Sequence, residues 1–274
     1  MSAAEMQAYL ARLYVDDMFR HLSRLAPELT LAGYKLTEAE REAACGLDVP
    51  MLDFFAASLK SKRKKRMTHA FPALFHLDPG GMDRYYDRYV QLYPARPEET
   101  VSDDVVAFGR FIETTLACDP DLPPYASEVA RYERLYYAMN NALELEEGDV
   151  AASGEPPSLP ESGQAVPVLA KGVAIASFTH DVLAVAEALR HAREPQAQSA
   201  GEQCLVFQKL PRSPSPKVFR VSAGTRMLLD LCDGRRDVEA ITVAVERQTG
   251  AAGLRDEIAG TLRRLSGLRL LRFR

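Results

Sequence analysis

Hydrophobic positions in the first part of the chain recur with helical spacing. Between Ala4 and Ala26 an apolar residue returns every three or four positions, which predicts one helix with a single buried face. The segment Thr37-Glu-Ala-Glu40 has the form of a capping box and predicts the start of a second helix. A third helix is predicted from Asp48 to about Arg66, with Pro50 in its first turn, where a missing N–H costs nothing.

Helical spacing continues to about residue 146. Tyr85, Tyr89 and Tyr93 lie four residues apart, a pattern that is typical of a helix face packed in a core. Ser102 is expected to cap the next helix, and a longer helix is predicted to follow the pair Pro123-Pro124. Residues 1–146 are therefore predicted to form an all-helical domain.

The pattern changes after residue 146. The stretch Glu146–Gln164 is acidic and then rich in Pro, Ser and Gly without an apolar period, which predicts a linker over residues 147–165. Beyond it, strand patterns and helix patterns mix. The predicted elements are a strand Val166–Phe178, a helix Asp181–Arg193, a loop Glu194–Glu202, a hairpin of strands Cys204–Leu210 and Lys217–Ser222, three helices separated by Gly234, Gly250 and Gly267, and a last strand within Leu268–Arg274. We therefore expect an α+β chain whose second domain, residues 166–274, is winged-helix-like, with a small antiparallel sheet and three helices.

Charge divides the chain in the same way. The net charge is −4, but residues 201–274 hold 14 Lys and Arg against 8 Asp and Glu, which leaves 20 against 30 for residues 1–200. A basic module attracts an acidic ligand, so the C-terminal domain is expected to bind one. The run Lys60–Arg66 places six cations in seven residues of the acidic part. It is compatible with a solvated helix end or with docking to an acidic protein surface, and its lack of an interleaved aromatic residue weakens nucleic-acid binding.

Residues that would carry catalysis are sparse. The five histidines form no HExxH or i, i+4 pair, and the four cysteines stand far apart with no CxxC, so most are expected to be buried thiols. No Walker-type loop, GxGxxG or GxSxG occurs. We expect a chain that is not an enzyme and holds neither metal nor cofactor. A chain without a run of about 18 apolar residues or a secretory signal is also expected to be soluble and cytoplasmic.

A groove for a peptide is predicted in the C-terminal domain. If the strand Lys217–Ser222 lies at a sheet edge beside the helix Leu254–Leu265, the groove between them offers backbone hydrogen-bonding groups, apolar pockets and positive charge, which suits an acidic peptide added as a strand. The alternative is that Val218, Phe219 and Val221 fill the core and the edge is covered. The predicted peptide-binding residues are Lys217, Val218, Phe219, Arg220, Val221, Ser222, Arg255, Ile258, Leu262 and Arg263.

Two parts of the chain carry a family resemblance. The segment Ser215–Leu271, with Thr225-Arg-Met-Leu-Leu-Asp-Leu-Cys-Asp-Gly-Arg235, resembles the leader-peptide recognition elements of ribosomal peptide natural-product pathways, the fold of the pyrroloquinoline-quinone peptide chaperone. Phe71-Pro-Ala-Leu-Phe75, Tyr89-Val-Gln-Leu-Tyr-Pro94 and Pro123-Pro-Tyr-Ala-Ser-Glu-Val-Ala-Arg-Tyr-Glu-Arg134 resemble the helical domain of partner proteins of multinuclear non-haem iron oxidases, as in methanobactin and 3-thiaglutamate pathways.

The resemblance implies a division of labour. Three strands and three helices would bind the leader of a precursor peptide against the third strand and third helix. The helical domain would bind the oxidase, which holds the iron and remodels a cysteine of the precursor. The implied partner-binding residues are Tyr86, Tyr89, Tyr125, Arg131 and Glu133. Two alternatives remain open: a winged-helix DNA-binding regulator, for which the C-terminal positive charge is suitable, and a free-standing enzyme that would copurify with stoichiometric metal.

Overall fold

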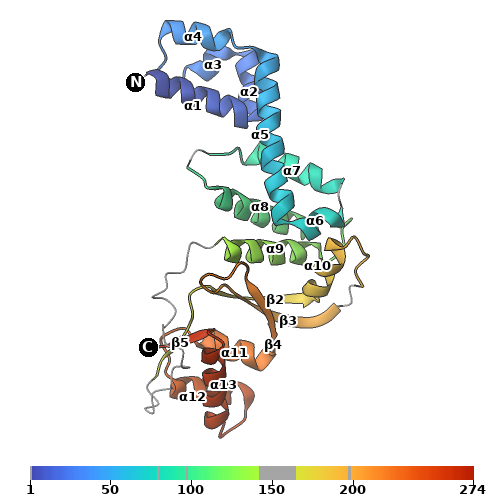
Figure 1. Ribbon diagram of the computed structural model, residues 1–274, viewed down its shortest axis with the longest axis vertical. Helices are drawn as coiled ribbons and strands as arrows, with labels where there is room; N and C mark the ends of the chain where they lie inside the picture. The colour runs from blue at the N-terminus through green and yellow to red at the C-terminus, as the bar shows by residue number, and fades with distance from the viewer. Residues whose placement is uncertain (1, 79, 97, 142–164, 197–198) are drawn as a thin grey trace. The chain divides into compact units, whose positions relative to one another are not determined.

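The computed structural model describes residues 2–78, 80–96, 98–141, 165–196 and 199–274. The chain is a mixed helix and sheet protein that divides into two compact units (Figure 1). The helical unit comprises Met1–Arg134 and Ala186–Glu194, and the C-terminal unit comprises Leu135–Val185 and Pro195–Arg274. The predicted α+β class is confirmed. The sequence suggested domains of residues 1–146 and 166–274, whereas the helical unit ends at Arg134 and also includes Ala186–Glu194.

Ten helices are described before the hairpin of the C-terminal unit. They are α1 (Ser2–Val15), α2 (Asp17–Leu25), α3 (Pro27–Leu31), α4 (Glu38–Cys45), α5 (Val49–Ala70), α6 (Pro72–Leu77), α7 (Gly81–Leu92), α8 (Val101–Leu116), α9 (Ala126–Asn140) and α10 (Val182–Arg190). The last residues of α9 and the first residues of α10 belong to the C-terminal unit.

Polar caps explain where several helices begin. The predicted capping box at Thr37 is confirmed, with Thr37 accepting from the Glu40 N–H at 3.3 Å and Glu40 accepting from the Thr37 N–H at 2.8 Å. The single helix predicted for residues 4–26 is wrong, because Asp16 accepts from the Phe19 N–H and starts α2 there. The cap predicted at Ser102 is also wrong. Thr100 and Asp103 form a second capping box, so α8 starts one residue before Ser102.

Helix α5 is common to two packed clusters of the helical unit (Figure 1). Leu52 on its first half joins a core of residues from α1 to α4. Met67 on its second half is fully buried, and the helix ends at Phe71. Around that end an aromatic cluster surrounds Phe108, whose ring lies 5.4 Å from that of Phe71 and 5.2 Å from that of Tyr89. The helix therefore runs past Arg66, where the sequence placed its end.

Within its described residues, the C-terminal unit contains two antiparallel sheets, β1-β5 and β2-β3-β4, and three helices that follow most of the strands. Its strands are β1 (Pro167–Leu169), β2 (Val173–His180), β3 (Ser199–Gln208), β4 (Lys217–Val221) and β5 (Leu271–Phe273), and its last helices are α11 (Ala223–Leu231), α12 (Val238–Thr249) and α13 (Arg255–Gly267). The predicted hairpin is confirmed as β3 and β4, paired from Gln208 with Lys217 to Cys204 with Val221. Strand β2 pairs with the other side of β3, giving the order β2-β3-β4.

The single strand predicted for Val166–Phe178 is wrong. A turn at Gly172, whose φ of 77° favours glycine, separates β1 from β2. Strand β1 pairs instead with β5, the predicted final strand. The loop predicted for Glu194–Glu202 is also too long, because β3 already begins at Ser199. Lys171-Gly172 interrupts the apolar stretch, and this pair was the sequence signal that could have divided it.

An apolar core holds the C-terminal unit together. Val206 from β3 and the inner faces of α11, α12 and α13 form it, with Leu229, Ile241 and Leu262 fully buried. Gly250 ends α12 in the left-handed conformation, which confirms the prediction that this glycine separates two helices. The predicted linker lies outside the described residues except Ala165, which is 2% exposed and belongs to this core. Over the described parts of the chain, no helix is long and apolar enough to cross a membrane.

Candidate functional site

Strand β4 forms one edge of the three-stranded sheet. Its only strand partner in the described part of the chain is β3. Lys217 and Arg220 are exposed, and Val218, Phe219 and Val221 are half-buried. In an edge strand, alternate residues direct N–H and C=O groups away from the sheet. The strand therefore offers backbone groups, two cations and apolar side chains along one line.

A hollow of about 350 Å³ lies at the C-terminal end of β4. Its walls combine apolar side chains with an ion pair, since the Arg226 Nε donates to Asp230 at 2.6 Å. This hydrogen bond raises the pKa of Arg226 above its ordinary value, although burial opposes the shift. The lining residues are Glu202 and Cys204 of β3, Val221 of β4, Ala223, Arg226, Met227, Asp230 and Leu231 of α11 and its start, and Gln248 of α12. Such a hollow accepts an apolar side chain beside a polar group.

The structure separates the predicted peptide-binding residues into three groups. Lys217 to Val221 lie on the edge strand, and Ser222 accepts from the Thr225 N–H at 3.1 Å as the cap of α11. Ile258 and Leu262 lie in the apolar core, 4% and 0% exposed. Arg255 and Arg263 are exposed on α13, with Arg255 3.8 Å from Glu239.

Helix α11 lines the hollow, whereas the sequence predicted that α13 flanks the strand. The sequence predicted a helix here but gave it no contact with the peptide, so Met227 and Leu231 were missed. Their i, i+4 spacing beside the Arg226–Asp230 pair was the available signal. Because Ile258 and Leu262 fill the core, the exposed positions of α13 are mostly charged, with Asp256 and Glu257 in its first turn and Arg263 and Arg264 further along.

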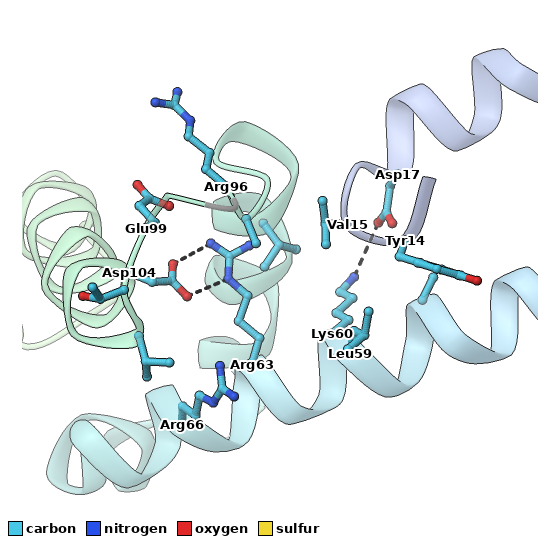
Figure 2. Close-up of a pocket in the computed structure, with 15 residues that line it drawn as sticks. Tyr14, Val15, Asp17, Leu59, Lys60, Arg63, Arg66, Arg96, Glu99 and Asp104 are labelled. Atoms are coloured by element: carbon cyan, nitrogen blue, oxygen red, sulfur yellow. Dashed lines mark hydrogen bonds and ion pairs between the residues drawn. The ribbon is translucent and has the colours of Figure 1, made fainter. Parts of the chain in front are cut away.

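The helical unit contains a second pocket, about 170 Å³, between α1, α5 and α8 (Figure 2). Arg63 reaches across from α5 to Asp104 on α8, with Nε–Oδ2 and Nη2–Oδ1 distances of 2.9 and 2.6 Å, and also donates to the Tyr93 carbonyl at 2.9 Å. Tyr89 donates to the same Asp104 carboxylate at 2.8 Å. Burial disfavours the charge of Arg63, but hydrogen bonding to Asp104 still raises its pKa above the ordinary value. These contacts fix one wall of the pocket.

The basic run is partly used inside the fold. Lys60 lies 2.9 Å from Asp87 and 3.9 Å from Asp17, and Lys64 lies 2.6 Å from Asp83. With Arg63 bound to Asp104, three of the six cations of Lys60–Arg66 have carboxylate partners on other helices. The run lies within α5 instead of at a helix end, so stabilisation by the helix dipole does not explain it.

The implied partner-binding residues are mostly interior. Tyr86 and Tyr89 are each 1% exposed, and Tyr86 donates to the Lys60 carbonyl at 2.7 Å. Tyr125 and Arg131 are half-buried, with Arg131 3.8 Å from Glu113. Tyr85 and Tyr89 are core residues, as their spacing predicted, but Tyr93, the third residue of that pattern, follows the end of α7 and is 49% exposed. In this conformation Tyr86 and Tyr89 present almost no surface to another protein.

Glu133 is a buried carboxyl that holds two helices together. It is 1% exposed on α9 and accepts the N–H groups of Ala73 and Leu74 at 3.0 and 3.1 Å, at the N-terminus of α6. Arg190 donates to it at 3.3 Å. Burial raises the pKa of Glu133 to about 7, against the opposing effect of these donors.

In the described part of the chain, the four cysteines differ in burial and the possible metal ligands do not gather. Cys204 and Cys232 are buried and Cys45 and Cys118 are exposed, so the expectation of mostly buried thiols is half correct. Burial raises the pKa of the Cys232 thiol to about 12. Across the residues that the structure describes, no three His, Cys, Asp or Glu side chains gather where they could hold a metal ion.

Comparison with family models found no match to this chain, and comparison with curated proteins found none either.

Proposed function

We propose that this chain is a non-catalytic recognition subunit that binds the leader of a precursor peptide and presents its cysteine-containing end to a multinuclear iron oxidase. The observation that carries the proposal is the edge strand β4, which ends beside a hollow lined by α11. In this proposal the chain itself holds no cofactor, and the iron belongs to the partner enzyme.

The order of elements supports a leader-recognition role. The family resemblance implies three strands followed by three helices in a winged-helix-like arrangement. Here β2, β3 and β4 form one antiparallel sheet and α11, α12 and α13 follow, with α10 inserted between the first and second strands. Strand β4 is then the third strand, the one against which a leader would bind.

Strand addition gives a physical basis for the binding. A peptide paired with β4 would gain main-chain hydrogen bonds at the edge, and specificity would come from side chains that reach the hollow. The exposed Lys217 favours acidic residues in the peptide, whereas Arg220 is already 2.8 Å from Asp181. Holding the leader also raises the effective concentration of the reacting end at the oxidase, to the order of millimolar for a short tether that fits the span.

The first experiment is a pull-down of the tagged full chain from its native cell, with mass spectrometry and metal analysis of the eluate. An iron-containing oxidase together with a short precursor peptide supports the proposal. Elution with DNA and without a peptide would favour the winged-helix regulator, and stoichiometric metal on this chain alone would favour a free-standing enzyme.

Affinity for the captured peptide then locates its site. Met227→Glu, in the hollow, is expected to weaken binding of the labelled leader by at least about tenfold, because it places a charge where an apolar side chain binds. Lys217→Glu is expected to weaken binding several-fold and to reduce the dependence on salt. Arg247→Glu on α12 is the matched control, since Arg247 is exposed and lies outside the hollow.

The α13 alternative is tested by Arg263→Glu. If this variant lowers leader affinity and Met227→Glu does not, the peptide lies along α13, as the sequence reasoning predicted. If no variant changes the affinity, strand addition at β4 is wrong.

A further inference from the structure

The outer face of α5 is apolar along its first half. Met51, Phe55 and Leu59 lie at i, i+4 and i+8 and are 51%, 47% and 41% exposed, and the neighbouring Phe54 is 67% exposed. Leu52 and Ala56 of the same helix are buried, so α5 already packs against the core through a different face. A row of large apolar side chains left in solvent marks an interaction surface.

The two phenylalanines each contact a neighbouring ring. The Phe55 ring contacts that of Tyr14 on α1 edge to face, with centroids 6.1 Å apart, and the Phe54 ring lies 5.8 Å from that of Phe55. Ordering these side chains in the unbound chain lowers the entropy that binding must spend.

The same outer face becomes basic along the second half of α5. Lys62 and Arg66 continue the row of Phe55 and Leu59 at helical spacing, and Lys65 lies beside them. All three are exposed, and within the described residues none has a carboxylate partner, in contrast to Lys60, Arg63 and Lys64. A complementary surface must therefore be apolar at one end and acidic at the other.

The pocket of Figure 2 lies where the apolar and basic halves meet. Leu59 and Arg66 both line it, together with Tyr14 and Val15 of α1. Its volume of about 170 Å³ accommodates one side chain of a partner, and Arg63, fixed by Asp104, keeps its wall in place. The pocket borders the outer face of α5, because Ala56 and Arg63, which also line it, are buried on the inner side of the helix. A preformed pocket beside an interaction surface suits an anchor residue of the partner.

This pattern disfavours a second copy of the chain as the occupant. Two α5 helices related antiparallel by a two-fold axis would place each apolar half against the other copy's basic half. A parallel pair would place Lys62, Lys65 and Arg66 against the same cations. The apolar half likewise offers nothing to a nucleic-acid backbone, which requires cations.

We infer that the outer face of α5 is the docking surface for a protein partner that inserts an apolar side chain into the pocket and sets carboxylates against Lys62, Lys65 and Arg66. This inference rests on the proposed function, under which that partner is the iron oxidase. It moves the oxidase interface away from Tyr86, Tyr89 and Glu133, which are buried.

The test measures the affinity of the full chain for the purified iron oxidase that the pull-down identifies. Phe54→Glu is expected to weaken the complex by at least about tenfold, because it places a charge in the apolar half of the interface. The double variant Lys62→Glu/Arg66→Glu is expected to weaken it by a similar factor and to remove most of its salt dependence.

The controls sit on the C-terminal unit. Val243→Glu replaces an apolar side chain that is 60% exposed on α12, and Arg247→Glu reverses an exposed cation of the same helix. Both are expected to leave oxidase affinity within twofold of the wild type. Circular dichroism and thermal unfolding of every variant confirm that the fold is retained, and leader affinity is expected to stay unchanged in the α5 variants.

The outcomes separate the inference from the proposed function. If the α5 variants bind the oxidase as tightly as the wild type, the docking surface is wrong while the recognition role stands. If the wild type binds no oxidase, both fall. A concentration-dependent dimer of the wild type that Phe54→Glu dissociates would make the surface a homodimer interface, and loss of leader affinity in Phe54→Glu would assign it to the peptide; either result overturns the inference.

Discussion

The two units bury different chemistry. In the helical unit, the buried polar residues include Arg63, Asp104 and Glu133, all of which can carry charge. In the described part of the C-terminal unit, the buried polar residues are the uncharged Gln208, Thr242 and Ser266, set in or around an apolar core. Buried charges must find partners of matching geometry, whereas apolar side chains accept any well-filled arrangement. The helical unit should therefore respond to pH and to single charge deletions, and the C-terminal unit to changes of volume.

The largest expected effect is that of Arg63→Ala. Removing the guanidinium leaves the Asp104 carboxylate buried without its cation, and the free energy of unfolding of the helical unit should fall by about 4 kcal/mol. Urea titration followed by circular dichroism measures the loss. Lys62→Ala, one residue away and exposed, is the control and should cost less than about 0.5 kcal/mol.

The double variant Arg63→Met/Asp104→Leu tests whether the buried ion pair stabilises the helical unit or only avoids an unpaired charge. It removes both charges and keeps most of the buried volume, so it should recover more than half of the stability that Arg63→Ala loses. If the double variant is less stable than Arg63→Ala, the ion pair stabilises the helical unit by more than the cost of leaving one charge unpaired. Buried charge would then be a net source of stability in this unit.

Leu262→Ala tests the apolar core of the C-terminal unit. Leu262 is fully buried on α13, and its truncation should cost about 3 kcal/mol through lost burial and the cavity left behind. Hydrogen exchange should accelerate in α11, α12 and α13. Equal acceleration in α5 and α8 would contradict the view that each unit depends on its own core.

Glu133→Gln tests the pH response of the helical unit. The pKa of Glu133 rises from 4.5 to about 7 on folding, so between these pH values the folded state holds the proton more often than the unfolded state. The contribution of Glu133 to the free energy of unfolding is therefore fully present below pH 4.5. It is lost as the pH rises to about 7, by somewhat less than 3 kcal/mol. Unfolding of the wild type across this range should show the slope. The variant should show a flatter profile, and an unchanged slope would assign the titration to another group.

Ser222→Ala should have the smallest effect. Ser222 caps α11 by accepting from the Thr225 N–H, and loss of such a cap costs about 1 kcal/mol. Ser215→Ala, in the turn before β4, is the control and should change stability by less than half as much. Ser222 is also a predicted peptide-binding residue, so the leader affinity of Ser222→Ala should be measured at temperatures below and above the unfolding transition of the variant. If affinity is lost only at temperatures where the variant unfolds, Ser222 affects binding only through stability.

Local signals in the sequence predicted much of the fold. The capping box at Thr37, the hairpin of β3 and β4, and the end of α12 at Gly250 each depend on a few neighbouring residues, and all are confirmed. Several errors concern where an element begins or ends, as at Ser102 and Arg66, and two concern a single predicted element that the structure divides. Asp16 divides a continuous helical period, whereas Lys171-Gly172 was a turn signal inside a stretch that otherwise has the pattern of a strand.

The candidate sites were harder to predict because tertiary partners decide them. The run Lys60–Arg66 looks uniform in sequence, yet Asp17, Asp83, Asp87 and Asp104 occupy half of its cations and leave the other half on the surface. Ile258 and Leu262 were expected both to line the inner side of α13 and to contact the peptide. They lie in the apolar core. The sequence shows which residue types are present, and only the fold assigns them to inside or outside.

Because α5 is long, the rotational position of each residue around its axis constrains which changes in its length the fold can accept. Its 22 residues span about 33 Å without an internal Gly, and its Pro lies in the first turn. One residue inserted between Leu59 and Lys60 would rotate everything beyond it by about 100°, which would turn Arg63 from Asp104 and move Lys62 and Arg66 off the row of Phe55. Insertions and deletions should therefore be tolerated in the segments that connect the helices but not within α5, where the fold and the outer face share one rotational register.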